Sequence, residues 1–150
     1  MTGGLARLRW WELPELLPLE QEAFGPEAWS ETLLWSELAQ TGSRHYVVRR
    51  DDDGTVAGYA GLWAYDDEAY VQNLVVRADR RGSGIGSELL TELLDEAQRR
   101  GACTVGLEVR ATAEGAQRLY RRFGFEAVGR RRAYYQPSGT DAVVMVRRAA

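Results

Sequence analysis

A glycine-rich turn between an apolar strand and an amphipathic helix limits the folds open to this chain more than any other feature. The strand ends at Val76, the turn carries Gly82, Gly84 and Gly86, and the helix continues to about residue 100. Glycine permits φ > 0 and lets a ligand approach the backbone, so successive N–H groups can converge on one anion. The first helical turn adds unsatisfied N–H groups and the positive end of the helix dipole. The segment therefore predicts either a phosphate-binding loop or an ordinary strand-to-helix turn.

Two common phosphate-binding motifs do not fit this turn. A P-loop ends in Gly-Lys-Ser/Thr, but this chain has no lysine, and all 19 of its basic side chains are arginine. A dinucleotide-binding unit requires G-x-G-x-x-G, whereas here the pattern is G-x-G-x-G and Ser87 takes the place of the third glycine. An acid, Glu108, does follow 22 residues after Gly86. The dinucleotide interpretation therefore stays open, with a broken motif.

The pattern Arg-x-x-Gly-x-Gly over residues 81–86 resembles the acetyl-CoA pyrophosphate loop of the GNAT acetyltransferase superfamily. Further strings are similar to the RimI-type N-terminal acetyltransferases, which modify a small-subunit ribosomal protein. In chain order these strings are Trp29-Ser30, Asn73–Val76, Leu107–Arg110, Leu119–Phe125 and Arg132–Pro137, followed by Asp141-Ala142. The resemblance covers most of the chain. It implies the GNAT fold and acetyl transfer from acetyl-CoA.

The resemblance also implies which residues bind acetyl-CoA. The pyrophosphate would bind the backbone of the loop formed by Arg81, Gly82, Ser83, Gly84, Ile85, Gly86 and Ser87. Backbone groups of Leu74, Val75 and Val76 would bind the acetyl-pantetheine arm, and one of them would polarise the thioester carbonyl. The side chains of these three residues also fit a plain strand core. Ala113 departs from the family pattern, which commonly has a coenzyme-contacting asparagine there, so Ala113 is not in the predicted set.

Two residues are candidates for acid–base chemistry. Glu108 lies on the non-core face of a predicted strand and matches the family's catalytic base. A carboxylate with an ordinary pKa of about 4.3 would take the amine proton through a water molecule. Tyr120, a phenol with an ordinary pKa of about 10, would protonate the departing thiolate. The alternatives are a solvated strand charge for Glu108 and a core aromatic for Tyr120.

Three classes of function remain open. The first is a RimI-type enzyme that acetylates a protein N-terminus, with a ribosomal protein as partner. In this interpretation Tyr134 and Tyr135 match a loop that holds the peptide, although they also fit simple hairpin packing. The second is a GNAT enzyme acting on a small amine, and the third is a non-catalytic acetyl-CoA sensor or a nucleotide-binding module. Direct attack in a ternary complex is the simplest mechanism, because no suitable nucleophile suggests an acetyl-enzyme.

Composition excludes several other classes. A net charge of −3 argues against a nucleic-acid-binding surface, and no apolar run is long enough to span a membrane. No secretory signal pattern opens the sequence, which predicts a cytoplasmic location. A single cysteine, Cys103, and a single histidine, His45, are poor material for a metal site, so we expect no metal cofactor. Cys103 is expected to be a small buried residue and His45 to be structural.

Periodicity and turn residues predict one α+β domain over residues 1–150, with a central mixed sheet flanked by helices. We expect Ser30 to cap the second helix, with Leu33, Leu34 and Leu38 on its buried side. The third helix carries a clear apolar stripe, formed by Ile85, Leu89, Leu90, Leu93, Leu94 and Ala97. The predicted helices are 12–24, 30–39, 84–100 and 114–122, and the predicted strands are 5–11, 45–48, 56–65, 68–76, 104–109, 127–132 and 142–147.

Overall fold

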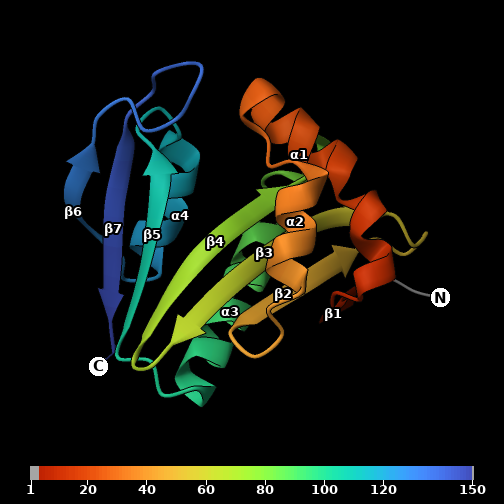
Figure 1. Ribbon diagram of the computed structural model, residues 1–150, viewed down its shortest axis with the longest axis horizontal. Helices are drawn as coiled ribbons and strands as arrows, with labels where there is room; N and C mark the ends of the chain where they lie inside the picture. The colour runs from red at the N-terminus through yellow and green to blue at the C-terminus, as the bar shows by residue number, and fades with distance from the viewer. Residues whose placement is uncertain (1–3, 150) are drawn as a thin grey trace.

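A seven-stranded mixed sheet runs through the molecule in the computed structural model, which describes residues 4–149 (Figure 1). The strand order is β1-β2-β3-β4-β5-β7-β6. Every neighbouring pair is antiparallel except β4 and β5, which are parallel. The strands are β1 Gly4–Arg7, β2 Arg44–Arg50, β3 Val56–Tyr65, β4 Glu68–Val76, β5 Thr104–Arg110, β6 Glu126–Arg131 and β7 Ala142–Arg148. The predicted α+β class with a mixed sheet is confirmed.

Helices cover both faces of the sheet. α1 (Leu17–Phe24) and α2 (Glu31–Leu38) lie on one face, and α3 (Ile85–Arg99) and α4 (Glu114–Arg122) lie on the other (Figure 1). Side chains alternate along each strand, so the sheet contributes residues to a hydrophobic core on each of its faces. On β2, Tyr46 and Val48 pack toward α1, whereas Val47 packs toward α3. Three short 3₁₀ segments complete the set: η1 Trp10–Glu15, η2 Gly25–Glu27 and η3 Ala78–Arg80.

The apolar stripe of α3 is the centre of the larger core. All six predicted stripe residues are buried, from Ile85 at the first position of the helix to Ala97 in its last turn. A buried leucine contributes about 1.5–3 kcal/mol relative to an exposed one, so this stripe fixes α3 firmly against β2, β3 and β4. The rigid helix in turn fixes the glycine-rich loop from which it starts.

The parallel pair β4 and β5 separates after a short contact. Pairing is limited to Glu68 with Thr104, Ala69 with Val105, and Tyr70 with Gly106. Beyond these pairs the two strands diverge, and the upper half of the sheet opens like a V (Figure 1). Among residues 4–149, the second half of β4 therefore has no strand partner on its β5 side.

A bulge interrupts the pairing of β3 with β4 where the separation begins. Gly61 pairs with Asn73 and Leu62 pairs with Val71, so Gln72 is an extra residue on β4. A bulge bends its strand and redirects the side chains around it. We attribute the divergence of β4 from β5 to this bend.

Two predictions about the N-terminal third need correction in their bounds. The first strand ends at Arg7 rather than residue 11, and the predicted helix over 12–24 is two pieces, η1 and α1. Pro14 and Pro18 explain the division, because proline has no N–H to donate and is tolerated in the first turn of a helix. The other predicted elements are confirmed to within about two residues.

Two predictions about burial are wrong. Leu33 was expected on the buried side of α2, but 41% of its surface is exposed, and only Leu34 of the three leucines is fully buried. α2 has eight residues, and the buried ones are Leu34 and Glu37. Leu33 is one position from Leu34, which is about 100° around the helix, so its side chain points outward. Cys103 was expected to be buried but is exposed, because it precedes β5 in the α3–β5 connection. The predicted Ser30 cap is confirmed: its hydroxyl accepts a hydrogen bond from the Leu33 N–H at 3.1 Å.

None of the helices that the structure describes is both long and apolar enough to span a membrane.

Candidate active site

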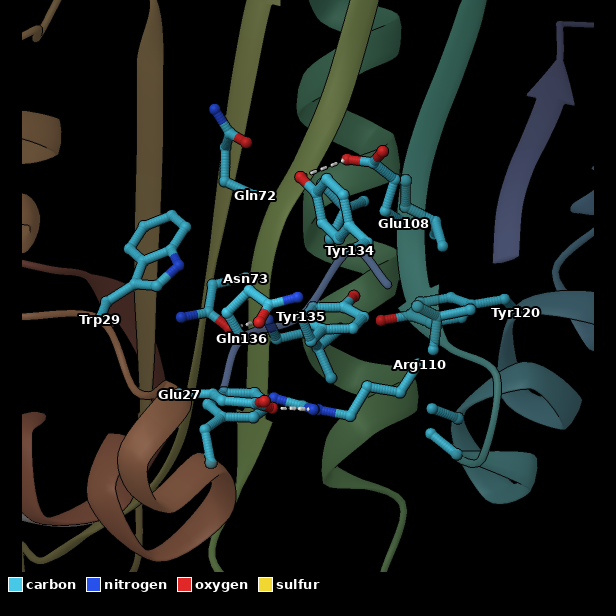
Figure 2. Close-up of a pocket in the computed structure, with 17 residues that line it drawn as sticks. Glu27, Trp29, Gln72, Asn73, Glu108, Arg110, Tyr120, Tyr134, Tyr135 and Gln136 are labelled. Atoms are coloured by element: carbon cyan, nitrogen blue, oxygen red, sulfur yellow. Dashed lines mark hydrogen bonds and ion pairs between the residues drawn. The ribbon is translucent and has the colours of Figure 1, made fainter. Parts of the chain in front are cut away.

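A cavity of about 390 Å³ lies in the opening between β4 and β5 (Figure 2). Side chains from six regions line it: the end of α1, the α1–α2 connection, β4, β5, α4 with its N-cap residue, and the β6–β7 connection. The cavity brings together Glu108, Tyr120, Tyr134 and Tyr135, four predicted site residues that are up to 27 positions apart in sequence. Two further charged residues that line it are Glu27 and Arg110.

Glu108 projects from β5 into this cavity, on the face opposite the core. Its Oε1 accepts a hydrogen bond from the Tyr134 hydroxyl at 3.0 Å, and its Oε2 pairs with the Arg131 guanidinium. Its side chain is about one quarter exposed, at 28%. The carboxylate is therefore held in place, and the partial exposure of its side chain is compatible with a base acting through water.

Tyr120 reaches the same cavity from α4, and Figure 2 shows its hydroxyl directed inward. The ring is 7% exposed and packs edge-on against Phe125, with 5.7 Å between ring centroids. Its hydroxyl has no hydrogen-bond partner among residues 4–149. Burial raises the pKa of Tyr120 above its ordinary value, so the phenol stays protonated at physiological pH. The ring thus belongs to the core, as one sequence interpretation held, while the hydroxyl is free to act as a proton donor.

Tyr134 and Tyr135 meet edge to face over the cavity, with 5.0 Å between their ring centroids. Arg110 stacks on the Tyr135 ring, its guanidinium carbon 4.2 Å from the ring centroid. Burial raises the pKa of Tyr135 to about 12, and burial together with the hydrogen bond to Glu108 raises the pKa of Tyr134. The pair therefore packs within the β6–β7 connection and also presents two neutral hydroxyl groups near Glu108.

Glu27 was not predicted, although it joins three parts of the cavity wall. One of its oxygens pairs with Arg110 on β5 (Figure 2). Its Oε2 accepts a hydrogen bond from the Ser138 N–H at 2.8 Å. These hydrogen bonds, from Ser138 first and then from Arg110, hold the pKa of Glu27 below its ordinary value. In the sequence, the only signal was an acid after a Gly-Pro turn just before Trp29. Such a signal gives no hint of contacts more than 80 residues away.

The glycine-rich loop has a left-handed backbone conformation at two of its glycines. Gly82 and Gly84 have φ of +81° and +92°, and Gly84 is the residue from which α3 begins. Gly86 serves another purpose, because a Cβ there would lie 3.2 Å from the Leu119 side chain. It allows α3 and α4 to pack closely at the loop.

Two arginines add positive charge beside the loop. Arg81 is exposed and its Nε donates to the Val76 carbonyl at 3.3 Å. Arg122, at the end of α4, donates to the Ser87 hydroxyl at 3.4 Å. The structure thus places Arg122 next to the phosphate-binding candidate.

The three β4 residues predicted to bind the acetyl-pantetheine arm have different side-chain environments. Leu74 lines the cavity, Val75 is buried in the core under α1, and Val76 is partly buried. All three lie on the half of β4 that does not pair with β5. Their backbone edge is therefore accessible from the cavity side, and the core role and the binding role are compatible.

The chain's one histidine and one cysteine lie outside the cavity. His45 is buried, and its Nε2 lies 3.0 Å from Glu92 Oε2 on α3, with Glu96 close by. Arg99 binds both carboxylates, and Arg100 binds Glu96 and lowers its pKa to about 2. The histidine thus joins an ion-pair network between sheet and helix, in agreement with the predicted structural role.

Comparison with known proteins decides the family. The model described as "Acetyltransferase (GNAT) family" matches residues 6–125. The chain belongs to the GNAT acetyltransferase family. It is 42% identical over 134 residues, 86% of this chain and 82% of the other, to the N-alpha-acetyltransferase RimI of Mycobacterium tuberculosis. The expected RimI-type resemblance and N-acetyltransferase class are confirmed.

Solved structures show the same GNAT architecture. The ribosomal-protein-S18-alanine N-acetyltransferase of Escherichia coli superposes with a TM-score of 0.85 at 32% identity, covering 98% of this chain and 94% of that one. A phosphinothricin acetyltransferase of Sinorhizobium meliloti, solved with acetyl-CoA, superposes equally well at 24% identity, covering 100% and 90%. Because both share this fold, the fold alone does not distinguish a protein acceptor from a small amine.

Ala113 is the position where this GNAT chain departs from the family pattern. It lies at the start of α4, lines the cavity and offers no side-chain donor. The nearby Gln117 amide does not replace one, because its Nε2 donates to the carbonyls of Arg110 and Ala111 at 3.0 and 3.1 Å. Gln117 therefore stabilises the β5–α4 connection, and the contact expected of the family asparagine is absent from position 113.

Proposed function

We propose that this enzyme transfers the acetyl group of acetyl-CoA to the α-amine of a protein N-terminus, by direct attack in a ternary complex. One observation carries the proposal: a single cavity at the opening between β4 and β5 holds the carboxylate of Glu108, the free phenol of Tyr120 and the tyrosine pair. The E. coli relative is named for the alanine of ribosomal protein S18. We therefore propose the N-terminal alanine of a ribosomal protein as the natural acceptor.

Acetyl-CoA would enter along β4. Its pyrophosphate would bind the backbone N–H groups of residues 82–87, where two glycines with positive φ and the start of α3 direct donors outward. The acetyl-pantetheine arm would lie along the unpaired edge of residues 74–76, and a backbone N–H there would stabilise the oxyanion. The structures of fold neighbours with CoA or acetyl-CoA support this donor.

The reaction needs two proton transfers. Glu108, through a water molecule, would accept a proton from the attacking amine, and the amine nitrogen would form the new bond to the thioester carbon. The tetrahedral intermediate would then collapse and break the carbon–sulfur bond. Tyr120 would donate its proton to the departing thiolate, so that free CoA thiol and the acetylated amine result. No acetyl-enzyme and no metal are required.

The loop assignment gives a prediction for donor binding. Replacing Gly84 by valine is expected to weaken acetyl-CoA binding by at least about tenfold, because φ of +92° strains a branched residue and its side chain would obstruct the ligand. Arg81→Ala should weaken binding less, since backbone groups do most of the work. Isothermal titration with acetyl-CoA measures both. Gly101→Val is the control: Gly101 has φ of +80° just after the C-terminal end of α3, so it carries similar strain at the opposite end of the helix from the loop. Equal affinity of folded Gly84→Val and Gly101→Val would remove the loop from the site.

The acceptor assignment gives a second prediction. A peptide that begins with alanine and has an internal lysine should be acetylated mainly on its α-amine. The α-amine has a pKa of about 7.7–8.0 against about 10.4 for lysine, so more of it is the free base at neutral pH. Tyr134 and Tyr135 can also hydrogen-bond the peptide backbone near the thioester. Mass spectrometry maps the acetyl group, and the enzyme's lack of lysine keeps its own side chains from contributing lysine signals.

A small amine is the alternative acceptor, and an assay of thiol release separates the two. Spermidine and peptides with different first residues are compared by release of free CoA thiol. Faster turnover with spermidine than with any peptide, or acetylation mainly at lysine, would identify this chain as a small-amine acetyltransferase.

A further inference from the structure

Glu20 on α1 is a carboxylate buried behind the cavity wall, with 1% of its surface exposed. Its Oε2 accepts a hydrogen bond from the Trp29 backbone N–H at 2.8 Å. Its Oε1 accepts hydrogen bonds from the Tyr59 hydroxyl and from Asn73 Nδ2. A buried carboxylate is costly unless donors surround it, so these three donors account for its presence in the core.

The hydrogen bond from Asn73 connects Glu20 to the donor side of the cavity. Asn73 follows the extra residue of the β4 bulge, and its Oδ1 accepts a hydrogen bond from the Leu74 N–H at 3.0 Å. Its Nδ2 also donates to the Tyr59 hydroxyl at 2.9 Å. The amide of Asn73 is thus fully occupied, and its orientation is fixed. Because Leu74 is the first residue of the segment assigned to the acetyl-pantetheine arm, the position of Asn73 sets the start of that segment.

The hydrogen bond from Trp29 connects the same carboxylate to the acceptor side. Trp29 lies between η2 and α2, and its side chain lines the cavity. Figure 2 shows Trp29 and Asn73 on the same side of the cavity, across from Glu108 and Tyr120. Residues 28–30 belong to no helix or strand, and the hydrogen bond to Glu20 joins them to α1.

We propose that Glu20 is a positioning residue that sets the spacing between the acceptor wall at Trp29 and the donor strand at Asn73. The inference rests on the proposed function, in which an amine and a thioester react in one ternary complex. Reacting atoms must approach to about 3–3.5 Å, and a displacement of about 1 Å costs on the order of 100-fold in rate. A single carboxylate that holds both walls keeps that spacing without touching either substrate.

Glu20→Gln tests the proposal with almost no change in volume. One carboxylate oxygen becomes an NH₂ donor, so either the Trp29 N–H or the Asn73 amide faces another donor and its hydrogen bond is lost. We expect kcat to fall by about 10–100-fold, while the Kd for acetyl-CoA changes by less than about threefold because the distant loop still binds the pyrophosphate. Asn73→Ala breaks the connection from Glu20 to β4, together with the hydrogen bonds of Asn73 to Tyr59 and Leu74, and leaves the connection to Trp29 in place. It is expected to lower kcat similarly. The double variant should lose little more than the worse single one, since both changes break one connection.

Glu37→Gln is the matched control. Glu37 on α2 is a second buried carboxylate, and it accepts hydrogen bonds from Arg44 Nε and from the Tyr46 hydroxyl, both at 2.9 Å. The substitution should therefore lower the melting temperature about as much as Glu20→Gln. Glu37 does not line the cavity, so kcat should stay within about twofold of wild type.

Two results would overturn the inference. One is wild-type kcat in folded Glu20→Gln with a lower melting temperature, which would make the carboxylate purely structural. The other is wild-type kcat in Asn73→Ala, which decides the matter even where Glu20→Gln does not fold. Failure of the proposed function is a separate result, because it appears in the wild-type acceptor comparison. The variants are then assayed with whichever amine the wild type acetylates, and the same kcat comparison applies.

Discussion

Glu108→Gln is expected to lower kcat by about 10²–10⁴-fold at neutral pH, the usual range for loss of a general base. The side chain keeps its size, and its amide oxygen can still accept the hydrogen bond from Tyr134, so the fold should be retained. The loss should shrink at alkaline pH, because an α-amine with a pKa of about 7.7–8.0 is then largely neutral without help. A pH profile of kcat under single-turnover conditions, from about pH 6.5 to 9.5, measures both effects.

The control for this variant is Glu68→Gln on β4. Glu68 also accepts a hydrogen bond from a tyrosine, Tyr70, at 3.0 Å, but neither residue lines the cavity. Its loss should leave kcat unchanged. Wild-type kcat in Glu108→Gln, where chemistry limits turnover, would show that this carboxylate is not the base and would direct attention to Glu27 in the same cavity.

Tyr120→Phe is expected to lower kcat by about 10²–10⁴-fold while the Kd for acetyl-CoA changes little, because the proton is needed only as the thiolate leaves. The stability of the protein should not fall. The phenylalanine ring keeps the packing on Phe125, and the missing hydroxyl has no partner among the described residues. An inactive variant with an unchanged or slightly raised melting temperature would separate a functional hydroxyl from a merely structural one.

Tyr70→Phe provides the comparison, since it removes a hydroxyl that is hydrogen-bonded to Glu68 outside the cavity. It should cost a little stability and no activity. If Tyr120→Phe instead releases CoA thiol at the wild-type rate in single turnovers, then the thiolate leaves without this acid or takes its proton from water.

Local patterns predicted most of the fold. The stripe on α3 and the alternation on β5 were sufficient because each side chain's environment follows from the period of its own element. Leu33 and Cys103 were mispredicted for the opposite reason. Whether a residue on a short helix or next to a strand is covered depends on elements far away in sequence, and hydrophobicity alone does not report this.

Some residues of the candidate site could be predicted from the sequence and others could not. Glu108, Tyr120 and the tyrosine pair were named because their strings resemble a family, and the structure brings all four to one cavity. Glu20 and Glu27 looked like ordinary helix and turn acids. Their importance depends on partners 9 to 111 residues away, and no periodicity or motif encodes such contacts.

The opening between β4 and β5 has a consequence for the mechanics of the molecule. Among residues 4–149, three pairs of strand residues join the β1–β4 half of the sheet to the β5–β7–β6 half. The amides of a bound pantetheine arm can form hydrogen bonds with the unpaired edge of β4. The arm would then connect the two halves of the sheet where the strands do not pair. Acetyl-CoA binding would then reduce the motion of the two sheet halves relative to each other, and release of CoA would restore that motion. Slower hydrogen exchange at residues 74–76 in the presence of CoA would be the visible sign of this cycle.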